Sequence, residues 1–305
     1  MIKCKVDENK EEIVMIHTIE NEILSVSAET KGGELTSLKR KDTGIEYLWQ
    51  GDPAYWSGRA YNLFPICGRL TEGKYTYKGQ TYLMGAHGFV RNSEMTLVEK
   101  TDNSMTFRLT DSPETLAQYP FSFVFEVTYT IVKDKLIHRF AVKNTGNEDL
   151  IFTLGGHPGF NVPLGEEVPF EEWYLEFDEP CKPEYIVFSK ACLCDGYAPY
   201  PLKEDKIMPL RHDMFDDDAI FLRGAANGVT LKSDRSSHGV YVTYPDMNHV
   251  GVWHKPKSDA PYVCIEPWRG VPSDDGKIDD FATKREMIRL APDGEYTNDM
   301  EITLF

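Results

Sequence analysis

The stretch FSFVFEVTYTIV, residues 121–132, decides the fold class of this chain. Aromatic and β-branched residues recur at every second position in it, which is the pattern of a strand with one buried face. After the three residues KDK, the segment LIHRFAVKNTG, residues 136–146, repeats the pattern and ends on a turn. We expect the two segments to pair as an antiparallel hairpin.

Outside this hairpin, further short apolar runs are bounded by Gly, Pro, Asp or Asn, as in GVTLKSD (228–234), GVYVTYPD (239–246), HVGVWH (249–254) and PYVCIEPW (261–268). Helical periodicity is scarce. SPETLAQYP (112–120) predicts one or two helical turns, with Ser112 as the cap and Pro113 at the first position. Many short strands separated by turn residues predict an all-β sandwich or barrel with few short helices.

The chain of 305 residues shows no linker and no clear repeat of fixed period. Its most polar stretch, PSDDGKIDDF (272–281), is short enough to be a loop. All-β domains can reach this size as single units, so we predict one domain over residues 1–305.

The charge balance excludes several classes of partner. Lys and Arg number 33 and Asp and Glu 49, which gives a formal net charge of −16. Such a chain repels nucleic-acid backbones and anionic lipid surfaces, so we expect no nucleic-acid or membrane partner. No apolar run reaches the length of a membrane span, and the N-terminus lacks the apolar core of a signal peptide, so a cytoplasmic location is expected by default.

The six cysteines do not form a recognisable metal pattern. Cys192 and Cys194 make a C-x-C pair, but no second pair or nearby histidine completes a zinc site. We therefore expect reduced, mostly buried thiols.

Ionisable residues placed among Gly and Pro are the candidates for chemistry. They are Arg69 in FPICGRLTEGKY, His87 in GAHGFVRN, His157 in LGGHPGFNVP, Glu266 in PYVCIEPWRG and Asp218 directly before an apolar run. We expect the glycines before His157 to let the backbone approach a ligand, and Pro267 to end the strand that carries Glu266.

Each of these residues also has an ordinary structural interpretation. A histidine beside glycine is more often part of a turn than a catalyst, and Glu266 could be the buried ion-pair partner of Arg69 or Arg269. No G-x-S-x-G elbow, Walker A loop or H-E-x-x-H motif is present. Two imidazoles and a carboxylate are a known ligand set, so a metal site made by His87, His157 and Glu266 stays open as an alternative.

Taken together, these segments resemble the aldose 1-epimerase (mutarotase) family, and within it the LacX-like branch. The resemblance covers nearly the whole chain and rests on the order and spacing of several motifs: GGELTSLKRKDTGIEYLWQGDPAYW (32–56), LFPICGRLTEGKYTYKGQTY (63–82), HGFVRN (87–92), GGHPGFNVP (155–163), DDAIF (217–221), CIEPWRG (264–270) and MIRLAPDGEY (287–296).

The resemblance implies a β-supersandwich of the galactose mutarotase type and the interconversion of the α and β anomers of an aldose, without a metal or an organic cofactor. By their match to the family's motifs, His157 is the catalytic acid, Glu266 the catalytic base and His87 an auxiliary histidine that contacts the sugar. Arg69 and Asp218 are the matching sugar contacts.

These residue types suit the implied reaction. Ring opening needs a proton removed from the C1 hydroxyl and another delivered to the ring oxygen, and closure reverses the roles. We expect the glutamate to be ionised and the histidine protonated near neutral pH. The partner is then a small-molecule aldose, and the sequence does not indicate the oligomeric state.

The sequence leaves alternatives for the substrate, for the class of function and for the aromatic residues of the cleft. Arg59 and Arg91 are candidates for receiving the phosphate of a hexose phosphate, or else ordinary surface residues. The chain could also be a non-catalytic carbohydrate-binding protein on the same fold. Trp268, Phe160 and Trp56 could line the sugar cleft, although a strand aromatic is more often part of the core.

Overall fold

The predicted hairpin lies at the centre of the largest sheet. The computed structural model describes residues 15–165 and 167–305, so Cys4 lies outside the described residues. Strands β9 (Phe123–Val132) and β10 (Lys135–Asn144) are antiparallel, with Phe125 opposite Val142. Buried and accessible side chains alternate along both strands, as the sequence pattern predicted.

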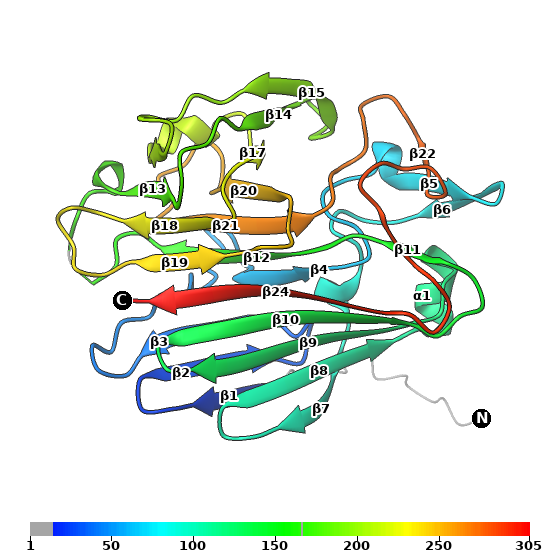
Figure 1. Ribbon diagram of the computed structural model, residues 1–305, viewed down its shortest axis with the longest axis horizontal. Coiled ribbons are helices and arrows are strands. Elements are labelled where there is room, and N and C mark those ends of the chain that lie inside the picture. Colours follow the sequence, from blue (N-terminus) through cyan, green and yellow to red (C-terminus); the bar gives the residue numbers. More distant parts are fainter. Residues whose placement is uncertain (1–14, 166) are drawn as a thin grey trace, which may run out of the picture.

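This sheet has nine strands in the order β16-β13-β18-β19-β24-β10-β9-β8-β7. Figure 1 shows most of them in front, from β13 down to β7. The remaining bounds are β16 Ile207–Pro209, β13 Tyr174–Phe177, β18 Gly228–Lys232, β19 Val240–Thr243, β24 Glu295–Leu304, β8 Ser104–Thr110 and β7 Thr96–Lys100.

A second sheet of seven strands carries the candidate residues His157 and Glu266. Its order is β15-β14-β17-β20-β21-β12-β4, which can be followed downward in Figure 1. The bounds are β15 Cys194–Pro199, β14 Glu184–Phe188, β17 Ile220–Arg223, β20 His249–Trp253, β21 Tyr262–Arg269, β12 Leu154–Asn161 and β4 Ala60–Leu63. Unlike β9 and β10, the central strands β12 and β21 are buried at every position except the last.

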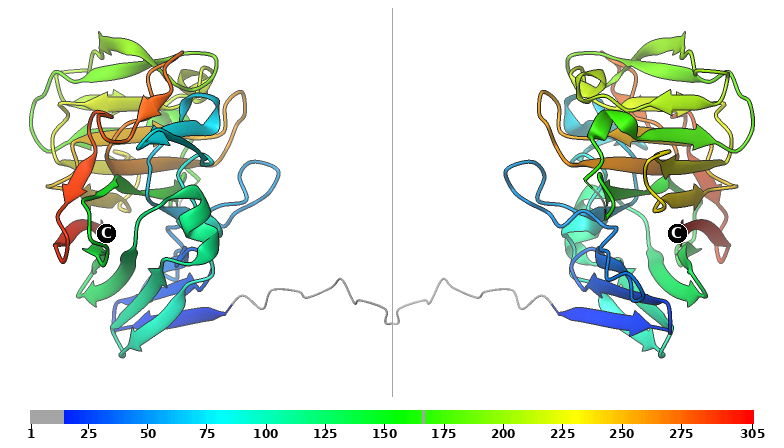
Figure 2. Two further views of the ribbon diagram at one scale, coloured as in Figure 1. Left: turned by 90° about the vertical axis from the view of Figure 1, so that its right-hand side faces the viewer. Right: turned by 90° about the vertical axis from the view of Figure 1, so that its left-hand side faces the viewer.

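Smaller elements complete the fold. Three antiparallel strands, β1 (Ile16–Glu20), β2 (Leu24–Glu29) and β3 (Leu35–Arg40), lie at the opposite end of the molecule from β14 and β15 (Figure 2). The other short strands are β5 (Lys74–Tyr77), β6 (Gln80–Leu83), β11 (Leu150–Phe152), β22 (Asp279–Asp280) and β23 (Ile288–Leu290). Short 3₁₀ helices cover Thr71–Gly73, Val90–Asn92, Phe170–Glu172 and His212–Phe215.

The expected helix is α1, Pro113–Gln118. Ser112 accepts a hydrogen bond from the backbone N–H of Thr115, and the Thr115 hydroxyl accepts one from the backbone N–H of Ser112. This reciprocal pair satisfies N–H groups that the first turn would otherwise leave unpaired, and Pro113 occupies a position that needs no donor. The predicted cap is therefore confirmed.

The core lies between the large sheets. Phe64 follows β4 and stacks on Phe125 of β9 with ring centroids 4.6 Å apart. Tyr129 of β9 donates its hydroxyl to the carbonyl of Gly33, which ties β9 to the turn between β2 and β3. One face of the seven-stranded sheet thus packs into the core, and its other face is left for a site. Within the described part of the chain, every helix is too short to cross a bilayer.

Candidate active site

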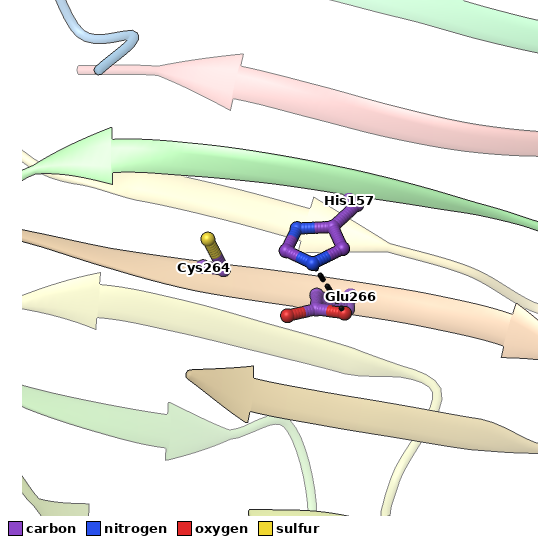
Figure 3. A group of neighbouring side chains, drawn as sticks. All are labelled: His157, Cys264 and Glu266. Carbon is purple, nitrogen blue, oxygen red and sulfur yellow. Dashed lines mark ion pairs between the residues drawn. The ribbon is translucent and has the colours of Figure 1, made fainter. Parts of the chain in front are cut away.

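His157 and Glu266 are direct neighbours across two central strands. The antiparallel strands β12 and β21 keep one register on both sides of a short gap in their pairing, and this register places His157 opposite Glu266. The side chains point toward one another, with His157 Nε2 3.3 Å from Glu266 Oε2 (Figure 3). Residues more than one hundred positions apart in sequence therefore form one polar pair.

A proline follows each member of the pair, and both prolines lie in the gap between β12 and β21. Proline has no N–H to donate to a ladder, so it fits where the two strands are not paired. The expectation that Pro267 ends its strand is therefore wrong, because β21 continues to Arg269 and pairs with β20 through this stretch.

The glycines near the pair provide room for side chains. A Cβ atom on Gly155 would lie 2.7 Å from Trp268 Cδ1, and one on Gly251 of β20 would lie 2.7 Å from the Phe221 ring and 3.3 Å from Glu266 Cβ. Neither glycine has a positive φ. Gly155 thus accommodates the Trp268 side chain, and the expectation that the glycines before His157 let the backbone approach a ligand stays a prediction.

A pocket of about 290 Å³ opens above this pair. All five predicted site residues line it: His157, Glu266, His87, Arg69 and Asp218. The remaining lining residues are Trp56, Tyr61, Gly68, Ala86, Arg91, Phe188, Cys192, Ala219, Trp253, Trp268 and Pro272. The volume lies near the lower end of the range for small-molecule sites, and the mixture of aromatic and convergent polar groups is typical of such sites.

His87 enters the pocket from a loop in a left-handed backbone conformation, with φ 64°. Its Nδ1 accepts a hydrogen bond from the backbone N–H of Gly68 at 3.2 Å. A neutral imidazole that accepts at Nδ1 carries its proton at Nε2, so His87 is an N–H donor there. Burial holds the pKa of His87 well below 6.5, and the neighbouring His157, Arg91 and Arg69 lower it further. It is therefore a neutral donor, with its ring 5.7 Å from that of His157.

Arginine side chains meet the pocket without a carboxylate partner. Among the described residues, Arg69 and Arg91 form no ion pair within 4.0 Å, and Arg91 lies over the Tyr61 ring at 5.1 Å. Arg59, the other candidate for a phosphate contact, does not line the pocket. Its backbone N–H donates to the buried Glu34 carboxylate, which places Arg59 in the supporting structure beside β4.

Burial sets the protonation of the central pair. It lowers the pKa of His157 to about 3, and the charge of Arg91 adds to this effect. It also raises the pKa of Glu266 well above 4.5, with a further contribution from Asp218. Both groups are thus driven toward neutral forms, which differs from the ionised pair expected from sequence. The physical reason is the cost of moving a charge out of water.

The neutral pair and the ion pair nevertheless hold the same number of protons. A protonated Glu266 beside a neutral His157 becomes a carboxylate beside an imidazolium when one proton crosses the 3.3 Å contact. The net charge of the site is zero in both states, so the pair titrates as a unit. A bound ligand that hydrogen-bonds both charged groups can therefore shift the balance toward the ion pair.

The structure changes the set of residues that could hold a metal ion, which in the sequence alternative was His87, His157 and Glu266. Among the described residues, the group whose donor atoms lie close enough to hold an ion is His157, Cys264 and Glu266, and it does not include His87. The five described cysteines are free thiols, and Cys67, Cys194 and Cys264 are buried.

Several pocket residues were missed by sequence reasoning. Tyr61, Trp253 and Phe188 lie on strands, and aromatic residues on other strands of this chain fill the core, so their residue type carries no distinguishing signal. Cys192 follows β14, and burial and the neighbouring Asp218 raise the pKa of its thiol to about 11. Of the aromatic residues proposed for the cleft, Trp56 and Trp268 line it, whereas Phe160 is fully buried in the core.

Known proteins are similar to this chain over nearly its whole length. Protein LacX, chromosomal, of Lactococcus lactis subsp. lactis is 36% identical over 298 residues, which cover 94% of this chain and 98% of LacX. The solved structure of a galactose mutarotase related enzyme from Lactobacillus acidophilus is 36% identical, with a TM-score of 0.91, and covers 95% of this chain and 97% of that one.

A galactose mutarotase-like protein from Lactobacillus casei is 28% identical, with a TM-score of 0.89 over 95% of this chain and 100% of that one. These structures confirm the predicted all-β supersandwich of the galactose mutarotase type. The model of the family Aldose 1-epimerase matches residues 15–302. This chain belongs to the aldose 1-epimerase family.

Proposed function

We propose that this protein is an aldose 1-epimerase that interconverts the α and β anomers of a hexose within one domain spanning residues 1–305. Membership of the family supports a mutarotase-type function. The observation that carries the finer proposal is the His157–Glu266 pair, held 3.3 Å apart on opposed strands and facing a pocket. One acid and one base at the same place are the two groups that mutarotation requires.

In the proposed reaction, Glu266 takes the proton of the C1 hydroxyl while His157 delivers a proton to the ring oxygen. The bond between C1 and the ring oxygen breaks, and an open-chain aldehyde forms. Rotation about the C1–C2 bond presents the other face of the aldehyde. The ring oxygen then attacks C1, His157 recovers its proton and Glu266 returns one to O1. The protons balance over the cycle, so the proposed reaction needs no further cofactor.

The neighbouring groups have supporting roles in this proposal. His87, a neutral donor at Nε2, polarises a sugar oxygen, while Arg69 and Asp218 hydrogen-bond sugar hydroxyls. Three polar atoms around the pair, His157 Nδ1, Arg91 Nε and Trp268 Nε1, are buried and have no hydrogen-bond partner among the described residues. Such unpartnered groups fit a pocket that takes a ligand rich in hydroxyls.

A second candidate is a hexose phosphate, which the pocket-lining Arg91 favours because no described carboxylate neutralises it. A guanidinium without a carboxylate partner can bind a phosphate dianion through charge-assisted hydrogen bonds. The net charge of −16 opposes this choice at long range.

Polarimetry tests the proposal. Freshly dissolved α-D-glucose, α-D-galactose and α-D-glucose 6-phosphate are followed with wild-type protein and with His157→Ala. We expect faster mutarotation of at least one sugar and about 100- to 10,000-fold less acceleration with the variant. A folded wild-type protein that binds these sugars without accelerating any of them would overturn the enzymatic proposal in favour of a carbohydrate-binding protein.

A further inference from the structure

A thiol lies beside the proposed acid–base pair and has no part in the proton transfers. Cys264 precedes Glu266 by two positions on β21, so both side chains leave the same face of the sheet (Figure 3). The donor atoms of His157, Cys264 and Glu266 all lie within 4.8 Å of one another, and all three residues are buried. This set combines a nitrogen, a sulfur and an oxygen ligand.

The spacing of these atoms suits a tetrahedral ion. In a zinc site with bonds of about 2.0–2.1 Å to nitrogen and oxygen, two such ligands lie about 3.3 Å apart. His157 Nε2 and Glu266 Oε2 are already 3.3 Å apart. A sulfur ligand lies about 3.6 Å from the others, so the Cys264 sulfur, now within 4.8 Å of both, must come closer by no more than about 1.2 Å.

The charges balance when such an ion binds. A divalent cation held by one thiolate, one carboxylate and one neutral imidazole leaves a net charge of zero. The metal-free group is also neutral. Cys264 is then a protonated thiol, and the His157–Glu266 pair holds two protons, one on the carboxylic acid and one on the neutral imidazole. Binding therefore releases two protons to solvent, one from sulfur and one from the pair, and buries no net charge.

We propose that His157, Cys264 and Glu266 form a binding site for a thiophilic divalent cation of the Zn²⁺ class, and that its occupation inhibits the enzyme. Since His157 and Glu266 line the pocket, the fourth ligand position faces it and takes a water. The bound ion occupies the Nε2 and carboxylate lone pairs that the proton transfers need. Inhibition thus rests on the proposed function, whereas binding does not.

The activity test compares two buried cysteines. Zn²⁺ should stop catalysed mutarotation by wild-type protein, and EDTA should restore it. Cys264→Ala should keep its basal activity and need at least tenfold more Zn²⁺ for the same inhibition. The matched control is Cys194→Ala, which removes a buried thiol outside the group and should remain as sensitive as wild type. Equal sensitivity of Cys264→Ala and wild type, or loss of activity on chelation, would overturn the proposal.

Binding is measured separately with Co²⁺ as a spectroscopic substitute for zinc. Wild-type protein should give a thiolate-to-cobalt charge-transfer absorption that Cys264→Ala lacks and Cys194→Ala retains. Cys264→Ser replaces the alanine variant if that variant does not fold. The absence of this absorption with wild-type protein would refute the site. If the absorption is present but no sugar is turned over, the site stands and the proposed function fails.

Discussion

Two buried histidines occupy central strands of the two large sheets, and their surroundings differ. His138 of β10 is 1% exposed, lies between the rings of Tyr129 and Phe140, and neither ring nitrogen has a hydrogen-bond partner among the described residues. His157 of β12 is 8% exposed and faces Glu266. Burial lowers the pKa of both to about 3. A perturbed histidine therefore indicates a site only when a proton partner and a pocket accompany it.

The largest effect is expected from the carboxylate of the functional pair. Glu266→Gln keeps the shape of the side chain and removes the base, so catalysed mutarotation should fall about 100- to 10,000-fold with little change in melting temperature. The matched control is Glu126→Gln on β9, where the carboxylate pairs with Arg108 at the surface. That variant should keep full activity and lose less than about 1 kcal/mol of stability. If Glu266→Gln and Glu126→Gln had similar activity, the claim that the seven-stranded sheet carries the catalytic base would be contradicted.

A core substitution in the nine-stranded sheet should lower stability and leave activity unchanged, which is the opposite of the result expected for Glu266→Gln. Phe125 is fully buried and stacked on Phe64, so Phe125→Ala should lower the free energy of unfolding by about 3–5 kcal/mol. Activity per folded molecule should be unchanged below the melting transition. Val132→Ala, on the exposed end of the same strand, serves as the control and should cost far less. Urea unfolding and polarimetry of the same samples separate stability from catalysis.

The smallest of the three effects concerns pH. In the unfolded chain, His138 binds a proton below about pH 6.5. In the folded protein the pKa of His138 is about 3, so His138 stays neutral until the pH is that low. Stability should therefore fall as the pH decreases through this window, and His138 accounts for about 2 kcal/mol between pH 7 and pH 5.

His138→Leu should remove that contribution, which would be seen as a smaller difference between urea midpoints at the two pH values. Activity at pH 7 should be unchanged. An unaltered pH dependence of stability in this variant would show that His138 is hydrated or partnered, and the contrast with His157 would be lost.

The two sheets also differ in what the sequence predicted. In β9 and β10 one face is buried, and the resulting alternation indicated both strands and their pairing. In β12 and β21 nearly every residue is buried, so no alternation is present and Pro267 was interpreted as a strand end. Placement among Gly and Pro, or directly before an apolar run, indicated the five candidate residues, and the family resemblance gave them their roles. All five line the pocket.

Two features of the site were beyond sequence reasoning. The contact between His157 and Glu266 depends on the register of strands distant in sequence, and their protonation depends on burial that only the fold reveals. Cys264 looked like one of several structural thiols until β21 placed it on the same face as Glu266. Local patterns predict elements, whereas a site arises from contacts between them.

The most direct test of the central claim is a double-mutant cycle on His157 and Glu266, measured as catalysed mutarotation of the preferred sugar. Because the two groups exchange protons within one reaction, removing either should disable both. His157→Asn combined with Glu266→Gln should then be no more than about tenfold slower than the slower single variant. Fully multiplicative losses would show that the residues act independently, and would contradict the shared acid–base pair.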